Sequence, residues 1–241
     1  MLVTTQNLSK YFGSTCILED VNVYIGEDSR IGLIGENGAG KSTFFGIITG
    51  DIDDYDGTIE RGNNTRIGYL KQNSGLNFKN TIWEEMVSVF EPLLETEKKL
   101  TELQQKMSSL TPESEELKKL TEEYNVLFAD FEHKGGYNYE FRIKTILNGM
   151  GFLDFDKTSL TANLSGGEKT RLARAKLLLW EPSLLILDEP TNHLDFKTLM
   201  WLEEYLNKEY KGAVLIVSHD RYFLDKTVTE IWEIEDTHLD S

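Results

Sequence analysis

Residues 35–43 read Gly-Glu-Asn-Gly-Ala-Gly-Lys-Ser-Thr, and they are the strongest indication of the fold in this sequence. An apolar run precedes it at 31–34, and residues 44–48 resemble the first turns of a helix. A glycine-rich loop between a strand and a helix can converge its backbone N–H groups on a phosphate. We therefore predict a nucleotide site, with Lys41 at the β- and γ-phosphates and Ser42 as a Mg²⁺ ligand. An ordinary glycine-rich turn is the alternative, but it rarely has both flanks.

The composition is that of a soluble globular protein, with 39% hydrophobic and 27% charged residues. No apolar run approaches the roughly 18 residues that span a bilayer, and residues 1–6 do not resemble a signal peptide. The single cysteine, Cys16, cannot form an internal disulfide, so we expect a reducing, cytoplasmic location. A net charge of −16 argues against general adhesion to nucleic acid, DNA included.

Short β-rich runs flank the glycine-rich loop. Residues 2–5 and 21–25 are predicted strands around a turn at residues 13–14, and residues 57–61 and 66–70 are two more. The aromatic pair at 11–12 has two interpretations. These rings either belong to the core, as most aromatic residues do, or stack on a purine.

Residues 81–131 are charged and helical in pattern, with more acidic than basic residues. Two narrow apolar seams predict an antiparallel coiled-coil hairpin, an arm that residues 135–136 close. Thr111 is the expected N-cap of the second helix, with Pro112 at its first position, and the first helix should have roughly 25 to 30 residues. Two solvated helices lying on the domain are the alternative. The seams consist of Leu93, Leu100, Leu103, Met107, Leu110, and then Leu117, Leu120, Tyr124, Leu127, Phe131.

Two apolar runs, 184–187 and 213–217, are typical of strands buried on both faces of a parallel sheet. Asp188 and Glu189 follow the first run, and His219 follows the second. Ligands in open α/β sheets bind at the carboxyl ends of strands, so Asp188 can hold Mg²⁺ and Glu189 can act on the attacking water. We expect His219 to contact the γ-phosphate. The structural alternatives are an acidic turn and a core histidine.

Residues 165–168, Ser-Gly-Gly-Glu, precede a predicted helix that runs to about Trp180. Ser165 and Glu168 have the spacing of a capping box. The two glycines weaken the first helical turn by roughly 1 kcal/mol each, so capping alone does not explain them. They would let a phosphate approach the helix N-terminus closely. Farther on, Asp195 should cap a helix at 196–206.

The order of these motifs resembles that of the ATP-binding cassette (ABC) ATPases over essentially the whole chain. Residues 189–195, Glu-Pro-Thr-Asn-His-Leu-Asp, and 218–225, Ser-His-Asp-Arg-Tyr-Phe-Leu-Asp, resemble the ABC-F subfamily, soluble two-cassette ATPases that act on the ribosome. The resemblance implies that Phe12, or otherwise Tyr11, stacks on adenine. It also implies that Gln72 senses Mg²⁺ and the γ-phosphate, and that residues 164–168 contact ATP bound to the opposite cassette.

The implied fold is α/β, an ABC-type P-loop ATPase domain with a mixed, largely parallel sheet, an antiparallel β subdomain and an inserted helical hairpin. We expect the ATPase domain at 1–80 and 137–241 and the arm at 81–136. The implied cofactors are ATP and Mg²⁺. The expected catalytic residues are Lys41, Gln72, Glu189 and His219, and the expected metal ligands are Ser42, Gln72 and Asp188. The expected cofactor-binding residues are Phe12, Gly35, Asn37, Gly38, Ala39, Gly40, Lys41, Ser42, Thr43, Ser165, Gly166 and Gly167.

The resemblance also implies partners. We expect a second cassette, the ribosome with its rRNA or tRNA, no transmembrane subunit and no DNA. The chain ends at Ser241 without an interdomain linker or second cassette, so we expect an N-terminal cassette, in a housekeeping translation factor or an antibiotic-resistance factor.

Two other kinds of ATPase remain as alternatives. The ATP-binding subunit of an ABC membrane transporter shares the catalytic motifs, but it would not be expected to carry a long hairpin between Gln72 and Ser165. Chromosome-maintenance and repair ATPases also insert coiled coils, but theirs run to hundreds of residues, whereas this arm has about fifty.

Overall fold

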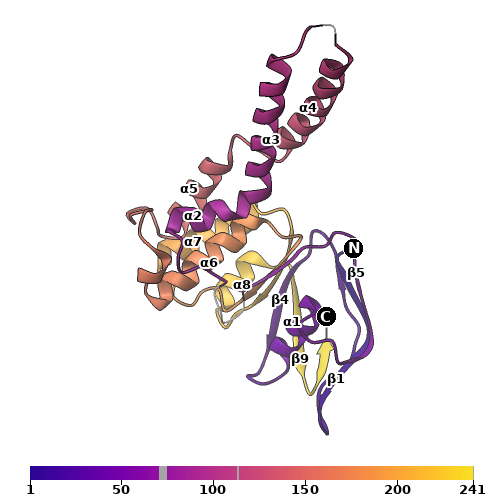
Figure 1. Ribbon diagram of the computed structural model, residues 1–241. Coiled ribbons are helices and arrows are strands. Elements are labelled where there is room, and N and C mark those ends of the chain that lie inside the picture. The colour runs from indigo at the N-terminus through magenta and orange to yellow at the C-terminus, as the bar shows by residue number, and fades with distance from the viewer. Residues whose placement is uncertain (71–74, 113, 241) are drawn as a thin grey trace. The chain divides into compact units, whose positions relative to one another are not determined.

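A computed structural model describes residues 1–70, 75–112 and 114–240 (Figure 1). The chain forms two compact units, Met1–Gly75 with Ser165–Ser241 as unit 1 and Leu76–Leu164 as unit 2. Gln72 lies outside the described residues, so its role stays a prediction. The predicted domain division, with an inserted arm at 81–136, also stays a prediction.

One sheet of unit 1 is antiparallel, and strand β1 is its centre. The predicted strand at 2–5 was too short, because β1 extends to Phe12 and forms a long hairpin with β2 around Gly13. The predicted strand at 21–25 was not one strand, since β2 ends at Val21 and β3 covers only Tyr24–Ile25. Asn7 and Asp20 have φ of 49° and 50°, and the register of the β1–β2 pairing shifts nearby. Apolar and polar residues therefore do not alternate regularly along these strands. The strands are β1 (Val3–Phe12), β2 (Thr15–Val21), β3 (Tyr24–Ile25) and β5 (Asp56–Arg61).

The second sheet of unit 1 has six strands in the order β10-β9-β4-β8-β7-β6. The strands from β9 to β6 are parallel, and only β10 is antiparallel to its neighbour. This mixed sheet beside an antiparallel one confirms the predicted fold class. The strands are β4 (Arg30–Gly35), β6 (Ile67–Tyr69), β7 (Leu184–Asp188), β8 (Ala213–Val217), β9 (Glu230–Glu235) and β10 (His238–Asp240).

Helix α1 (Lys41–Thr49) lies between the two sheets (Figure 1). Phe44 and Phe45 on this helix are fully buried in the core that the sheets share. Arg61 on β5 donates to the carbonyl oxygens of Ile47 and Ile48, at 2.6 and 2.9 Å, and so satisfies the last turn. The helix is therefore held at its C-terminus, while its N-terminus begins at the glycine-rich loop.

The other face of the six-stranded sheet is covered by α6 (Gly166–Trp180), α7 (Phe196–Lys208) and α8 (Arg221–Thr227) (Figure 1). Both faces of β7 and β8 are buried, as the apolar runs predict. The predicted cap of α7 is confirmed, because Asp195 accepts from the Thr198 N–H at 2.8 Å.

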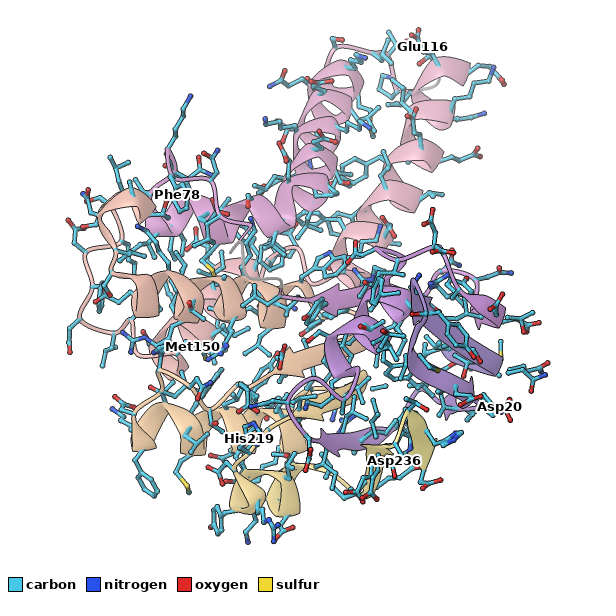
Figure 2. The ribbon with its side chains drawn as sticks, turned by 90° about the horizontal axis from the view of Figure 1, so that it is seen from below. Asp20, Phe78, Glu116, Met150, His219 and Asp236 are labelled. Atoms are coloured by element: carbon cyan, nitrogen blue, oxygen red, sulfur yellow. The ribbon has the colours of Figure 1, made fainter. Side chains whose placement is uncertain are left out.

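Unit 2 is helical, and α3 pairs with α4 as a hairpin (Figure 1). Gln104 and Tyr124 hydrogen-bond across it at 2.8 Å, and Glu116, labelled in Figure 2, lies near its turn. The elements are α2 (Ile82–Val87), a 3₁₀ turn η1 (Ser88–Phe90), α3 (Glu91–Ser108), α4 (Glu115–His133), α5 (Tyr139–Gly149) and a 3₁₀ turn η2 (Thr161–Asn163).

Two predictions for the hairpin were wrong. The cap of α4 is Ser114 and not Thr111, because the Ser114 hydroxyl accepts from the Leu117 N–H at 3.2 Å. The expected single first helix is interrupted by η1, and Pro92, which lacks an N–H, follows at the start of α3. Within the part of the chain that is described, no helix has both the length and the apolarity needed to cross a membrane.

Candidate nucleotide-binding site

The loop after β4 has a backbone that only glycine tolerates well. Gly35 and Gly40 have φ of 149° and 111°, and a Cβ on Gly35 would lie 2.7 Å from the Ile234 carbonyl oxygen. Gly40 caps α1 without any side-chain hydrogen bond. The first N–H groups of the helix therefore have no side-chain cap, which is the arrangement that an incoming phosphate can complete.

The Lys41 ammonium lies over this loop. It donates to the carbonyl oxygens of Gly35 and Glu36, at 2.8 Å each. These bonds hold a positive charge beside the glycine-rich backbone. The charge and the helix N-terminus both favour an anion at this place.

A cavity of about 280 Å³ opens beside the loop. Its wall combines the loop and the start of α1 with the ends of β7 and β8. Most of the predicted loop residues therefore share one cavity with Asp188, Glu189 and His219, which are far away in sequence. The lining residues are Ile17, Asn37, Gly38, Gly40, Lys41, Ser42, Thr43, Asp188, Glu189, Val217 and His219.

Glu189 has a strained backbone and a carboxylate with spare acceptor capacity. Its φ is 45°, and its N–H donates to the Val217 carbonyl oxygen at 2.8 Å. Oε2 accepts from the His219 N–H at 3.4 Å. Oε1 is buried and has no hydrogen-bond partner among the described residues, and it lies 3.6 Å from His219 Nε2. A water in the cavity could use this oxygen as its acceptor, as a general base requires.

Asp188 and Ser42 face the same cavity and supply hard oxygen donors. Burial raises the pKa of Tyr69, and the nearby Asp188 carboxylate raises it further. Among the described residues no three His, Cys, Asp or Glu side chains converge to hold a metal ion. This set fits Mg²⁺, which usually takes one or two protein oxygens and completes its shell with water and substrate phosphates.

The two aromatic residues at the end of β1 do not belong to the core. Phe12 is 54% exposed and Tyr11 is 41% exposed. The ammonium of the buried Lys10 lies 4.8 Å from the Phe12 ring centroid and pairs with Asp54 at 2.8 Å. Hydrogen bonding to the Cys16 thiol is the main cause that raises the pKa of Tyr11. Phe12 does not line the 280 Å³ cavity, so its adenine contact stays a prediction.

The N-terminus of α6 carries the capping box predicted from sequence. Ser165 accepts from the Glu168 N–H at 3.4 Å, and its own N–H donates to Glu168 Oε2 at 2.7 Å. The Ser165 hydroxyl is the first cause that lowers the pKa of Glu168. Gly166 has open space where a Cβ would point, so the turn leaves room for a ligand. Ser165, Gly166 and Gly167 do not line the cavity of Lys41.

Sequence reasoning missed Arg174, a buried arginine on α6 that donates to the loop following β7. The available signal was a basic residue at an apolar-facing position of a predicted helix. Without the fold, the sequence Arg-Leu-Ala-Arg-Ala-Lys at 171–176 reads as ordinary surface charge.

Comparisons with known proteins show which proteins this chain is similar to. The family model described as ABC transporter matches residues 18–192. The chain is 47% identical over 97% of its length to YdiF of Bacillus subtilis, and it spans 36% of that protein. It is 33% identical to ABC transporter F family member 5 of Arabidopsis thaliana over 97% of this chain and 34% of that one. It is 35% identical to the energy-dependent translational throttle protein EttA of Escherichia coli, over 91% of this chain and 38% of that protein. The chain thus spans between a third and a half of these relatives.

Two solved structures share the fold at low sequence identity. An ATP-binding subunit of an ABC transporter superposes with a TM-score of 0.73 at 21% identity, covering 100% of this chain and 89% of the other. A dimeric ATP-binding cassette in a post-hydrolysis state with ADP and phosphate has a TM-score of 0.64 at 22% identity, covering 100% and 97%.

Proposed function

Because this chain belongs to the ABC transporter family of ATP-binding cassettes, we propose that it binds Mg·ATP in the 280 Å³ cavity and hydrolyses it to ADP and phosphate. The observation that carries this proposal is the composition of the cavity wall. The wall combines the glycine-rich loop, the side-chain oxygens of Ser42 and Asp188, and Glu189, whose Oε1 has no hydrogen-bond partner among the described residues. This is the set that phosphoryl transfer to water needs.

Each side chain then has a role that its surroundings support. Lys41 and the N–H groups of α1 hold the phosphates, while Ser42 and Asp188 hold the metal. When bound, Mg²⁺ neutralises charge on the phosphate oxygens. Glu189 Oε1 orients the attacking water and takes its proton, and His219, 70% exposed at the cavity, faces the γ-phosphate.

For the longer protein we propose the first cassette of an ABC-F factor that acts on the ribosome, in housekeeping translation or antibiotic resistance. The likeness to the F family member and to the translational throttle protein supports this, as does the helical hairpin of α3 and α4. A second cassette would complete the site through residues 164–168, and a cytoplasmic location would suit the role.

Co-sedimentation with ribosomes tests the proposal for the longer protein. Glu189→Gln should trap the ATP-bound state, so this variant should pellet with ribosomes when ATP is present and remain in the supernatant without it. Lys41→Ala in the same background is the control, because it removes the phosphate contact. Recovery with a transmembrane subunit, and no ribosome pelleting, would support the transporter alternative instead.

A further inference from the structure

We propose that Arg174 is a positioning residue for Glu189, and that it holds the strained backbone from which the general base projects. The inference rests on the proposed function in one respect, namely that Glu189 is the general base. The contacts themselves are features of unit 1 alone.

Three hydrogen bonds join the Arg174 guanidinium to the loop that follows β7. Nη2 donates to the carbonyl oxygen of Glu189 at 2.9 Å. Nη1 donates to the carbonyl oxygens of Pro190 and Asn192, at 2.8 Å each. One planar fork therefore fixes three carbonyl groups within four consecutive residues, which a flexible ammonium cannot reproduce.

The loop needs such support because its backbone is strained at both ends. Glu189 and His193 have φ of 45° and 67°, in the left-handed region that residues with a Cβ adopt only when the surroundings hold them there. On one side of Glu189, its N–H is fixed by the Val217 carbonyl oxygen at the end of β8. On the other side, its carbonyl oxygen accepts from Arg174 and, at 3.2 Å, from the Asn192 N–H.

Burial shows that Arg174 is built into this place. The side chain is 6% exposed, and desolvation lowers its pKa, while the Asp188 carboxylate acts in the opposite direction. A buried guanidinium is costly unless its N–H groups are satisfied, so its three carbonyl partners and Arg174 stabilise one another. The helix that carries Arg174 begins at Gly166, so α6 bears the glycine motif at its N-terminus and, through Arg174, contacts the loop after β7.

A purely structural role would predict lost stability without a specific loss of turnover. Arg30 provides a matched control, because it is partly buried and, like the buried Arg174, donates to backbone carbonyl oxygens, here those of Tyr210 and Gly212. Arg30 starts β4 at the end opposite to the phosphate loop. Arg30 therefore makes the same kind of contact as Arg174, but away from the proposed site.

The experiment compares Arg174→Met, Arg174→Lys and Arg30→Met in this chain, by steady-state ATP hydrolysis and thermal unfolding. Since displacement of a catalytic group by about 1 Å can cost roughly 100-fold, Arg174→Met should lower kcat roughly 10- to 100-fold with KM little changed. Arg174→Lys should recover part of this loss. Arg30→Met should lower the unfolding temperature but leave kcat within about twofold, since it holds no part of the site. A kcat for Arg174→Met no lower than that of Arg30→Met would overturn the proposal.

Hydrogen exchange of the Asn192 and Leu194 amides keeps the test independent of activity and of the proposed function. The two variants should be compared at temperatures that give them the same free energy of unfolding. Under these conditions, these amides should exchange faster in Arg174→Lys than in Arg30→Met. Equal exchange would overturn the positioning role even if Arg174→Met does not fold. If the wild-type chain neither bound nor hydrolysed ATP while the two variants still differed in exchange, the proposed function would be wrong. The Arg174 contact would then remain as a support for the loop.

Discussion

Glu189 Oε1 lies 3.6 Å from His219 Nε2, although the two residues are thirty positions apart in the chain. Their approach follows from the parallel pairing of β7 with β8, in which Asp188 is the partner of Val217. The chain therefore leaves both strands at the same edge, and each loop delivers one titratable side chain to the cavity. Both residues line the same cavity as Lys41.

Glu189→Gln should keep ATP binding and reduce turnover by roughly 100-fold or more, because an amide cannot take a proton from water. The change is nearly isosteric, and the Oε2 contact with the His219 N–H can persist. Equilibrium binding of a fluorescent ATP analogue and steady-state hydrolysis measure the two effects separately.

Lys41→Ala is the contrasting variant, and it should weaken binding itself, since the ammonium lies over the phosphate loop. Lys208→Ala, which removes a surface pair with Glu204 on α7, should change neither quantity. Wild-type turnover in Glu189→Gln would show that another group acts on the water.

Phe12→Ala should weaken ATP binding roughly tenfold or more, because stacking of a base on an aromatic ring is worth about 1–3 kcal/mol. Tyr11→Ala should have a smaller effect, because Phe12 is the more exposed of the two rings, at 54% against 41%. Inorganic tripolyphosphate has no base, so its dissociation constant, measured by competition, should be the same for the wild type, Phe12→Ala and Tyr11→Ala. If Tyr11→Ala caused the larger loss, the ring that stacks on adenine would be Tyr11.

Shortening the helical hairpin should leave ATP hydrolysis intact. We would replace residues 104–124 with a short Gly/Ser linker, keeping the buried base of the hairpin at Leu93, Leu100 and Phe131. The cavity lies wholly in unit 1, so kcat and KM should stay within about twofold of wild type. In the longer protein, ribosome co-sedimentation should be lost. Loss of ATP binding or of cooperative unfolding would show that the hairpin is part of the cassette core.

The Glu189→Gln chain should be mainly monomeric without nucleotide and should form a weak dimer with Mg·ATP, measured by light scattering. ATP held between Lys41 of one copy and Ser165 of another would favour the pair by mass action. Wild-type turnover per molecule should therefore rise with protein concentration. Fast turnover that stays first-order in protein, with no dimer at any concentration, would show that one cassette completes its own site.

Several local features of this protein could be predicted from short stretches of its sequence. The glycine spacing of the phosphate loop, the Asp195 cap and the Ser165–Glu168 capping box each depend on residues within about nine positions of one another. Local rules were weaker where two choices compete within a few residues. Thr111 and Ser114 both resemble N-caps, and in the structure Ser114 is the cap, because its hydroxyl accepts from the Leu117 N–H.

Short stretches of sequence do not show which of these features share a site. Strands β4, β8 and β7 are neighbours in the sheet but not in chain order, so the meeting of Lys41, Asp188 and His219 depends on strand order and register. The exposure of Phe12 and the burial of Arg174 have the same origin. A residue type does not reveal whether it meets solvent or a carbonyl group from a distant loop, because packing between elements far apart in sequence sets that environment.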